Sequence, residues 1–363
     1  MEQFTIKADV LIVGAGPVGL VLANILKRNG VNVILIDKGI IRSKIPRAIA
    51  INQSTLDIFA TLGLNNIFDA GLIVKTINLY WKQKSLGQLN FNNTSLEHPY
   101  FFHIQQNIIE QHLENDLLKL GLRINQGTEL ISYTQSESLV YAQVKEDGQL
   151  ISIQADFLIG CDGGHSKVRE IMACGVEQRE YGPSFILADV TLENYTDRDT
   201  HYIFTAEGYL MIVPLPEKKY RLIFSVKPNH LLNAEHYLSD INSIQQLFNE
   251  RSNKEIKIAT VIWTTQAKYG HKISKQTIQN RVMLAGDALH QFSPVGGTNM
   301  NVGIQDAFAL AWRLIHAKNT SSQSSLFEYA SERRDVIQKQ RYITEWITAL
   351  ITRSKNYPLE GKI

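Results

Sequence analysis

Two glycine-rich turns, each close to an aspartate, stand far apart in this sequence. The first is GAGPVG at residues 14–19, a G-x-G-x-x-G pattern, and the second follows Asp287 in GDALHQFSPVGGTNMN. Such turns present backbone N–H groups, and a helix that starts in one adds partial positive charge, so both suit an anion such as a phosphate. The chemistry that these residues predict is therefore the binding of a nucleotide cofactor.

The elements around the first turn are those that a dinucleotide site requires. Val10–Val13 is an apolar run typical of a strand that is buried on both faces of a parallel sheet. Apolar residues then recur at helical spacing from Val18 to Leu26, and Val33–Ile36 forms a second buried run. Asp37 ends that second strand, at the place where a carboxylate can accept both hydroxyls of a ribose.

Each glycine of the first turn has a separate steric role in such a site. Gly14 permits the turn, Gly16 lets the backbone approach a pyrophosphate, and Gly19 lets the helix pack closely on the strand. An acidic residue at position 37 disfavours the 2′-phosphate of NADP in this site but fits NAD and the adenosine of FAD equally. We expect cofactor contacts from Gly14, Gly16, Pro17, Gly19, Asp37 and Lys38.

Composition indicates a globular protein of ordinary kind. The chain has 363 residues, of which 44% are hydrophobic and 20% charged, and its formal net charge is +2. No clustered basic run predicts nucleic-acid binding, no apolar stretch reaches the roughly 18 residues of a membrane span, and no signal-peptide pattern opens the chain. Cys161 and Cys174 fit a reducing compartment and the protein core, so we expect a cytoplasmic protein.

The period of the apolar residues changes along the chain. It drops to two between Arg123 and Ile159, with an Asp147-Gly148 turn, which predicts antiparallel strands. Residues 183–270 have mostly β character, and from Arg281 the buried-strand pattern returns. We therefore expect a discontinuous nucleotide-binding domain (1–75, 100–182 and 271–320), a β-sheet domain (76–99 and 183–270) and a C-terminal helical segment (321–363).

Several local boundaries can also be predicted. Ser54 is a candidate N-cap for a helix that carries Leu56 and Phe59, and Gly121 should end the helix that contains Ile109. We expect the helix after the second glycine-rich turn to begin near Met300 or Asn301. The segment from Arg341 predicts a short closing helix.

Three motifs, taken in order, are similar to those of a known family. They are GAGPVG at 14–19, CDGGHSKVR at 161–169 and GDALHQFSPVGGTNMNVGIQDA at 286–307. The chain resembles the FAD-dependent aromatic hydroxylases, flavoprotein monooxygenases related to p-hydroxybenzoate hydroxylase and phenol hydroxylase, over about residues 8–341. The resemblance implies an α/β fold: a Rossmann-like FAD-binding domain of the glutathione-reductase type, an inserted and mostly antiparallel β-sheet substrate domain, and C-terminal helices.

The resemblance also assigns further contacts along one extended FAD. It places Arg47, Asp162 and Gly163 near the pyrophosphate, the last two also near the nicotinamide cofactor, and Gln106 and Asp287 beside the ribityl chain. The turn residues and the helix after them should adjoin the flavin ring, with the positive end of that helix stabilising the reduced flavin. The residues implied at the ring are Pro294, Gly296, Gly297, Asn299, Met300 and Asn301.

Two features depart from the family pattern. Asn299 stands where the family usually has a third glycine, so its side chain could crowd or hydrogen-bond the ring edge and alter the flavin's redox tuning. The chain stops soon after its last helices, and we expect it to lack the thioredoxin-like C-terminal domain of the phenol hydroxylase branch.

The activity that the resemblance implies is the hydroxylation of a phenolic or polycyclic aromatic molecule. In the family, NADH or NADPH reduces FAD, which reacts with O₂ and transfers one oxygen from a C4a-hydroperoxyflavin. No Ser-His-Asp arrangement or metal-ligand spacing competes for the chemistry, so we assign no catalytic side chain and no metal. Candidate walls of the substrate pocket are Tyr202, Phe204, Tyr209, Met211, Phe224 and Trp263.

Two alternatives remain open at this point. A flavin-dependent halogenase, or another oxidoreductase of this fold, would share the FAD motifs, but the Trp-x-Trp pair of such halogenases is missing because Trp81, Trp263, Trp312 and Trp346 are all isolated. A flavin-binding protein without monooxygenase activity is the second alternative. The sequence does not choose between NADH and NADPH, and it does not indicate an oligomeric state.

Overall fold

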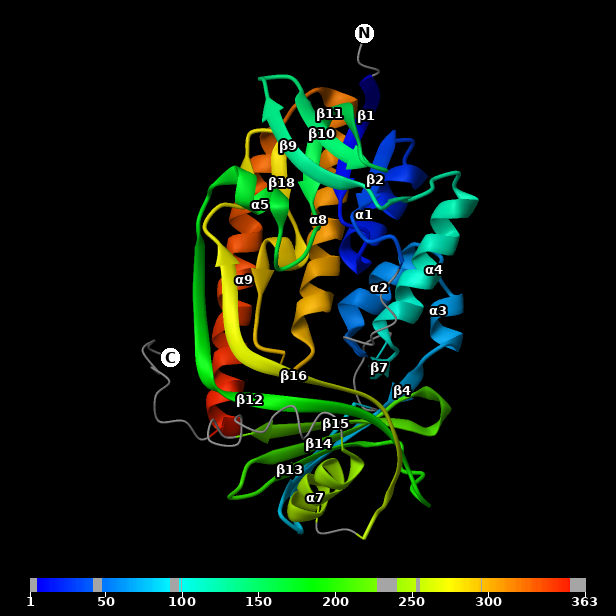
Figure 1. The fold of residues 1–363 in the computed structure, drawn as a ribbon, viewed down its shortest axis with the longest axis vertical. Coiled ribbons are helices and arrows are strands. Elements are labelled where there is room, and N and C mark those ends of the chain that lie inside the picture. The colour runs from blue at the N-terminus through cyan, green and yellow to red at the C-terminus, as the bar shows by residue number, and fades with distance from the viewer. Residues whose placement is uncertain are drawn as a thin grey trace.

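A computed structural model describes residues 5–41, 48–91, 98, 100–226, 240–252, 255–294 and 296–352. Helices and a parallel sheet form one part of the molecule, and a mostly antiparallel sheet forms the other (Figure 1). This arrangement confirms the predicted α/β fold class.

The parallel sheet is built from the apolar runs that frame the first and third motifs. Its five parallel strands follow the order β8-β2-β1-β11-β18, and β17 adds an antiparallel edge. Their bounds are Thr5–Val13 for β1, Val33–Asp37 for β2, Asn125–Gln126 for β8, Gln149–Gly160 for β11, Ile278–Gln279 for β17 and Val282–Leu284 for β18.

Different layers cover the two faces of this sheet, and for that reason its strands are apolar on both sides. Val10 and Ile12 belong to a core shared with the helices, whereas Leu11 and Val13 belong to a second core. The helices of the first core include α1 (Pro17–Arg28), α4 (Gln106–Lys119) and α8 (Thr298–Thr320). The second core contains β9 (Glu129–Gln135), β10 (Val140–Glu146) and α5 (Lys167–Met172). Strands β9, β10 and β11 pair antiparallel, as the period-two pattern predicted.

The second sheet follows the order β19-β16-β12-β15-β14-β13-β5-β6, and only the β13–β5 pair among those described is parallel. One of its faces packs on α7 (Ile241–Ser252), away from the parallel sheet (Figure 1). The strand bounds are Thr76–Trp81 for β5, Lys84–Asn90 for β6, Val176–Leu192 for β12, Thr200–Phe204 for β13, Tyr209–Pro214 for β14, Lys219–Val226 for β15, Ile258–Ser274 for β16 and His290–Gln291 for β19.

Smaller elements connect the two parts. A three-stranded sheet runs in the order β3-β7-β4, and two turns of 3₁₀ helix precede β15 and β19. The bounds of these elements are Ala50–Ile51 for β3, Gln53–Thr61 for α2, Asn66–Asp69 for α3, Leu72–Val74 for β4, Phe101–His103 for β7, Pro216–Lys218 for η1 and Gly286–Ala288 for η3.

The last helix, α9 (Ser324–Thr352), runs beside α8 and reaches the second sheet (Figure 1). Near its end, Ile347 packs against Phe185 and Tyr209 of that sheet. The prediction of a short helix from Arg341 is therefore wrong, because that segment is the end of a helix of 29 residues.

Two further predictions need correction. Asn52 rather than Ser54 caps α2, since its side chain accepts the N–H of Thr55 at 3.1 Å. Helix α8 begins at Thr298, before Met300. Strand β6 lies within residues 76–99, which the sequence assigns to the β-sheet domain, but every residue of β6 is exposed and no alternation marks the strand itself.

Within the described ranges, no helix combines the length and the apolar character that a membrane crossing requires.

Candidate functional site

The first two motifs meet at the carboxyl edge of the parallel sheet. Gly14 has φ +103°, and a Cβ built on it would lie only 2.4 Å from the carbonyl oxygen of Cys161 and 2.7 Å from the Cα of Asp162. Only glycine permits both this backbone conformation and this close approach. The turn after β1 and the turn after β11 therefore lie directly against each other.

The third motif closes on the same helix. A Cγ2 atom of Val18, in the first turn of α1, would lie 2.7 Å from a Cβ on Gly286 and 2.8 Å from one on Gly303. The Val18 side chain thus occupies a niche that exists because both residues are glycine. All three motifs converge on the N-terminal end of α1, although they are widely separated along the chain.

Two helix N-termini contribute to the site with open first turns. The N-cap residues of α1 and α8 are Gly16 and Gly297, and neither makes a side-chain cap to the described first turn. The first N–H groups of a helix have no partner within the helix, so both ends suit an anion or a partly negative ring edge. A Cβ on Gly16 would meet no described protein atom within 4 Å, which leaves space for a ligand at that turn.

Asp37 braces the first turn as well as ending β2. One carboxylate oxygen accepts the N–H of Ala15 at 2.7 Å, and the other accepts the N–H of Gly39 at 2.8 Å. Each carboxylate oxygen has a second lone pair, so these bonds leave acceptor capacity for ribose hydroxyls. Lys38 follows directly and is exposed.

Asp162 is engaged within its own motif. Its carboxylate accepts the hydroxyl of Ser166 at 2.5 Å and the N–H groups of Lys167 and Val168 at 2.6 and 3.1 Å. Burial raises the pKa of Asp162, while these hydrogen bonds counteract that rise. The side chain therefore orders the start of α5, and Gly163 beside it has φ +80° with no described atom in reach of a Cβ.

Asp287 lies half-buried on η3, directly after the buried strand β18. Its carboxylate accepts the Gln291 side-chain amide at 3.0 Å. The predicted ribityl anchor is thus positioned on the short segment that enters the third motif.

The turn that is predicted to adjoin the flavin ring is hydrogen-bonded by Asn301. Pro294 and Gly296 are exposed. The amide of Asn301 donates to the carbonyls of Gly297 at 2.7 Å and Ala50 at 2.8 Å. The Met300 side chain packs into the main core and is largely buried.

The side chain of Asn299 is hydrogen-bonded to the backbone of Phe292. Its side-chain oxygen accepts the N–H of Phe292 at 2.7 Å, and its amide donates to the Phe292 carbonyl at 2.8 Å. Asn299 also has an ordinary helical backbone, since it is absent from the described residues with positive φ. Both polar atoms of Asn299 are thus engaged with Phe292, while the contact of this side chain with the ring edge stays a prediction.

Gln106 begins α4 and connects that helix to the segment before α2. Its side-chain oxygen lies 3.4 Å from the N–H of Ala48, and its amide donates to Glu110 at 2.8 Å. Arg47, the other residue predicted for this region, lies outside the described residues.

Comparison with known proteins identifies this arrangement. The model of the family described as "FAD binding domain" matches residues 7–341. The chain belongs to this family.

Curated relatives of the FAD-binding family carry monooxygenase and hydroxylase names. The chain is 28% identical over 349 residues to 6-methylpretetramide 4-monooxygenase of Streptomyces rimosus, covering 94% of this chain and 62% of that protein. It is 27% identical over 341 residues to pentachlorophenol 4-monooxygenase of Sphingobium chlorophenolicum, covering 92% and 63%. The resemblance to the FAD-dependent aromatic hydroxylases is thereby confirmed at the level of the family, and the chain spans about three fifths of the length of these two relatives.

A solved structure supports the fold independently. The p-nitrophenol 4-monooxygenase PnpA of Pseudomonas putida superposes with a TM-score of 0.86 at 21% identity, over 97% of this chain and 91% of that one. This likeness confirms the flavoprotein fold.

The inserted sheet of this FAD-binding protein presents one face toward the rest of the molecule. Val213 and Leu215 of that sheet's β14–β15 region pack against Ile49, and the His103 ring nitrogen Nδ1 lies 2.9 Å from the carbonyl of Pro214. The predicted wall residues that share this face are Tyr202, Phe204, Tyr209, Met211 and Trp263. Phe224 lies on the opposite face among the residues that pack on α7, so its assignment to the wall is wrong.

Sequence reasoning missed two residues that organise the third motif. Asp306 lies within the quoted motif but was not singled out, and Arg333 lies outside every motif. Both are buried and bonded to each other at 2.6 Å. One signal could have identified Asp306: it is a charged residue on a helix face whose other residues are apolar.

Proposed function

We propose that this chain is an NAD(P)H-dependent FAD monooxygenase that hydroxylates a phenolic or polycyclic aromatic molecule. The observation that carries the proposal is the convergence of three flavin motifs on the N-terminus of α1, beside an inserted sheet with an aromatic face. One atom of O₂ would enter the aromatic ring, the other would leave as water, and NADH or NADPH would supply two electrons.

The residues present fit an extended FAD. The N-terminus of α1, with Gly14, Gly16, Pro17 and Gly19, would hold the pyrophosphate, because its open N–H groups favour anions. The adenosine ribose would bind at Asp37, with Lys38 at the exposed edge, and Arg47, Asp162 and Gly163 would complete the phosphate region. Asp287 and Gln106 would bind the ribityl chain.

The ring end would lie at the start of α8. The exposed turn of Pro294, Gly296 and Gly297 offers backbone groups, and the open first turn of α8 would stabilise negative charge on a reduced ring through its helix dipole. When bound, FAD supplies O₂ activation and oxygen transfer, while the protein orients the substrate and excludes water.

The substrate class follows from the sheet face and from the relatives. The described wall residues are aromatic or apolar, which suits a flat and largely apolar molecule. Relatives named for a chlorinated phenol and for a polycyclic amide support phenolic or polycyclic substrates. The free cysteines Cys161 and Cys174 suit a reducing compartment such as the cytoplasm, where nicotinamide cofactors are present.

Two measurements test the proposal. Purified protein is titrated with FAD and followed by flavin fluorescence, and NADH- and NADPH-dependent O₂ consumption is then recorded with a panel of phenols and polycyclic phenols. We expect a saturable FAD complex and consumption that an aromatic substrate stimulates, with a hydroxylated product detected by mass spectrometry. A complex that binds FAD yet hydroxylates no member of the panel would favour a flavin-binding protein without this activity, and absence of FAD binding would overturn the proposal.

A further inference from the structure

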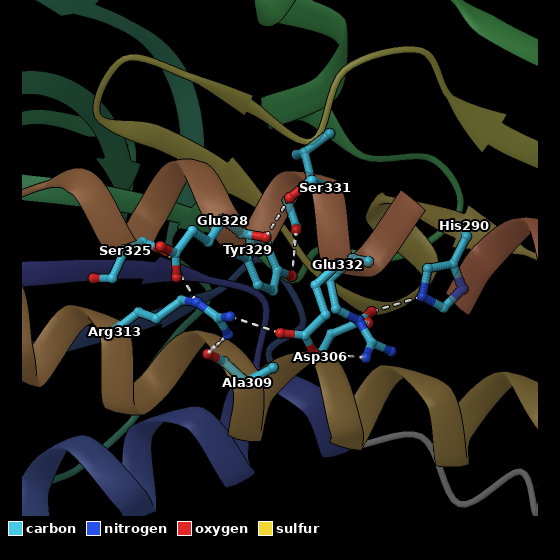
Figure 2. Close-up of polar contacts among 11 residues, drawn as sticks. His290, Asp306, Ala309, Arg313, Ser325, Glu328, Tyr329, Ser331 and Glu332 are labelled. Atoms are coloured by element: carbon cyan, nitrogen blue, oxygen red, sulfur yellow. Dashed lines mark hydrogen bonds and ion pairs between the residues drawn. The ribbon is translucent and has the colours of Figure 1, made fainter. Parts of the chain in front are cut away.

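A buried carboxylate on α8 gathers three donors from separate parts of the chain. Asp306 is fully buried and accepts the backbone N–H of Gly286 at 2.9 Å, Nε2–H of His290 at 2.6 Å and the Nε–H of Arg333 at 2.6 Å. Figure 2 shows His290 and Asp306 pointing toward each other, next to the face of α9 that carries Tyr329 and Glu332. We call Gly286, His290, Asp306 and Arg333 the Asp306 cluster.

Charge balance explains how this carboxylate tolerates burial. Burial alone would raise the pKa of Asp306, but the neighbouring His290, Arg333 and the Gly286 N–H hold that pKa below its usual value. Arg333 is only 4% exposed, so the ion pair is shielded from water. Removing one partner of such a pair leaves the other as an uncompensated buried charge, which is strongly unfavourable.

The Asp306 cluster acts on the residue proposed to anchor the ribityl chain. Gly286 immediately precedes Asp287, has φ +60° and is confined by the Val18 side chain. The hydrogen bond from its N–H to Asp306 therefore fixes the peptide from which Asp287 projects.

The same carboxylate reaches the start of the ring turn. His290 donates to Asp306 and stacks on Phe292, with ring centroids 4.9 Å apart and planes 22° apart. The backbone of Phe292 is in turn held by both polar atoms of Asn299. A single buried anion thus connects the segment at Asp287 to the segment before Pro294.

Helix α9 supplies the cation of the cluster and is itself firmly positioned. The Tyr329 hydroxyl donates to the carbonyl of Leu284 at 3.0 Å, which lies at the end of β18. Arg313 of α8 donates to Glu332 at 2.6 Å and to the carbonyl of Ser325 at 2.9 Å, so α8 and α9 are joined on both sides of Tyr329 (Figure 2). Arg333 therefore approaches Asp306 from a fixed direction.

We propose that Arg333 and Asp306 are positioning residues for the flavin, through which helix α9 sets FAD affinity. They would act through Gly286 and His290 on the orientation of Asp287 and of the turn at Pro294, without contact with the cofactor. This inference rests on the proposed function, since it assumes that these two segments hold FAD.

The test compares R333M with R334M, because Arg334 is the adjacent arginine of α9 and is exposed. Folding is checked by circular dichroism and thermal melting, and the FAD dissociation constant is measured by fluorescence titration. We expect R334M to match the unsubstituted chain and R333M to raise the dissociation constant about tenfold or more, equivalent to roughly 1.4 kcal/mol. The visible spectrum of the bound flavin should also shift in R333M, because the turn beside the ring relaxes.

Two gentler variants decide the outcome if R333M does not fold. R333K keeps the positive charge and should retain most of the FAD affinity of the unsubstituted chain. D306N keeps the shape of the side chain but loses its charge, and it should bind FAD more weakly. Folded D306N or R333M protein with unchanged FAD affinity and an unchanged flavin spectrum would overturn the inference, even if its melting temperature were lower. Failure of the unsubstituted chain to bind FAD would instead overturn the proposed function.

Discussion

At the scale of single residues, two aspartates are proposed to bind opposite ends of the ligand: Asp37 ends the buried strand β2, and Asp287 lies on η3 after β18. Asp37 already accepts backbone N–H groups of Ala15 and Gly39, whereas Asp287 lies on a short 3₁₀ turn that the Asp306 cluster holds. Their separate positions allow the adenosine end and the flavin end to be tested independently. FMN, which lacks the adenosine, is the ligand that distinguishes them.

Asp37→Ala should weaken FAD binding about tenfold or more, since hydrogen bonds to charged groups contribute about 1.5–3 kcal/mol each. Its affinity for FMN should fall less, because FMN has no ribose to contact residue 37 and is affected only through the bonds of Asp37 to Ala15 and Gly39. Fluorescence titration with both ligands measures the change in each dissociation constant relative to the unsubstituted chain. Equal losses for FAD and FMN would contradict the adenosine assignment.

Asp287→Ala should weaken FAD and FMN alike, because both ligands carry the ribityl chain. We expect a loss of about tenfold or more in each dissociation constant, from the same class of charge-assisted hydrogen bond. Asp335→Ala, at an exposed position on α9, serves as the control. Normal occupancy of the Asp287 variant by FAD would argue against a ribityl role for this residue.

Asn299 holds the backbone of Phe292 through two hydrogen bonds. Asn299→Gly removes both bonds, so the amide of Phe292 should exchange with solvent faster and FAD affinity should fall a few-fold. Asn299→Asp is the second variant, because it keeps an acceptor for the Phe292 N–H but loses the donor and places a negative charge beside the Phe292 carbonyl. Hydrogen exchange over residues 289–300, measured by mass spectrometry, should be fastest in Asn299→Gly, intermediate in Asn299→Asp and slowest in the unsubstituted chain. Equal protection in all three proteins would refute the role of Asn299 in holding the Phe292 backbone.

At the scale of elements, the strands and helices that carry the motifs could be predicted because their apolar pattern is local. Val10–Val13 is buried on both faces, and this shows directly in its sequence. The exposed strand β6 has no such alternation, so only its pairing with β5 defines it. Asn52 and Ser54 are both good N-cap residues two positions apart, and local sequence does not say which one faces Thr55.

The part that α9 has in the site could not be predicted for a different reason. Its contacts with the third motif depend on single long-range pairs, Arg333 with Asp306 and Tyr329 with Leu284. Neither pair leaves a periodic signal in the sequence. The motifs therefore predict where FAD contacts should lie, while the residues that hold those motifs in place became visible only in three dimensions.

At the scale of the whole molecule, His103 joins the three-stranded sheet to the second, mostly antiparallel sheet. It lies on β7, it is 4% exposed, and its ring nitrogen Nδ1 lies 2.9 Å from the carbonyl of Pro214 at the end of β14. Burial lowers the pKa of His103 to about 4 from 6.5. The folded protein therefore holds this ring neutral, with Nδ1–H donating across the junction.

The lowered pKa predicts a pH dependence of stability with a definite sign. Because the unfolded chain binds the proton more tightly, the contribution of His103 is complete above pH 6.5 and is lost as the pH falls toward 4. The loss at pH 5 should be about 2 kcal/mol, from roughly 1.36 kcal/mol per pKa unit. His103→Asn keeps a donor for the Pro214 carbonyl and cannot titrate, so urea unfolding at pH 7.5 and pH 5, with FAD saturating, should show a smaller loss in the variant. The other titrating groups are common to both proteins, so their effects cancel when the two losses of unfolding free energy are compared. An equal loss in both proteins would show that His103 is not kept neutral at the junction between these sheets.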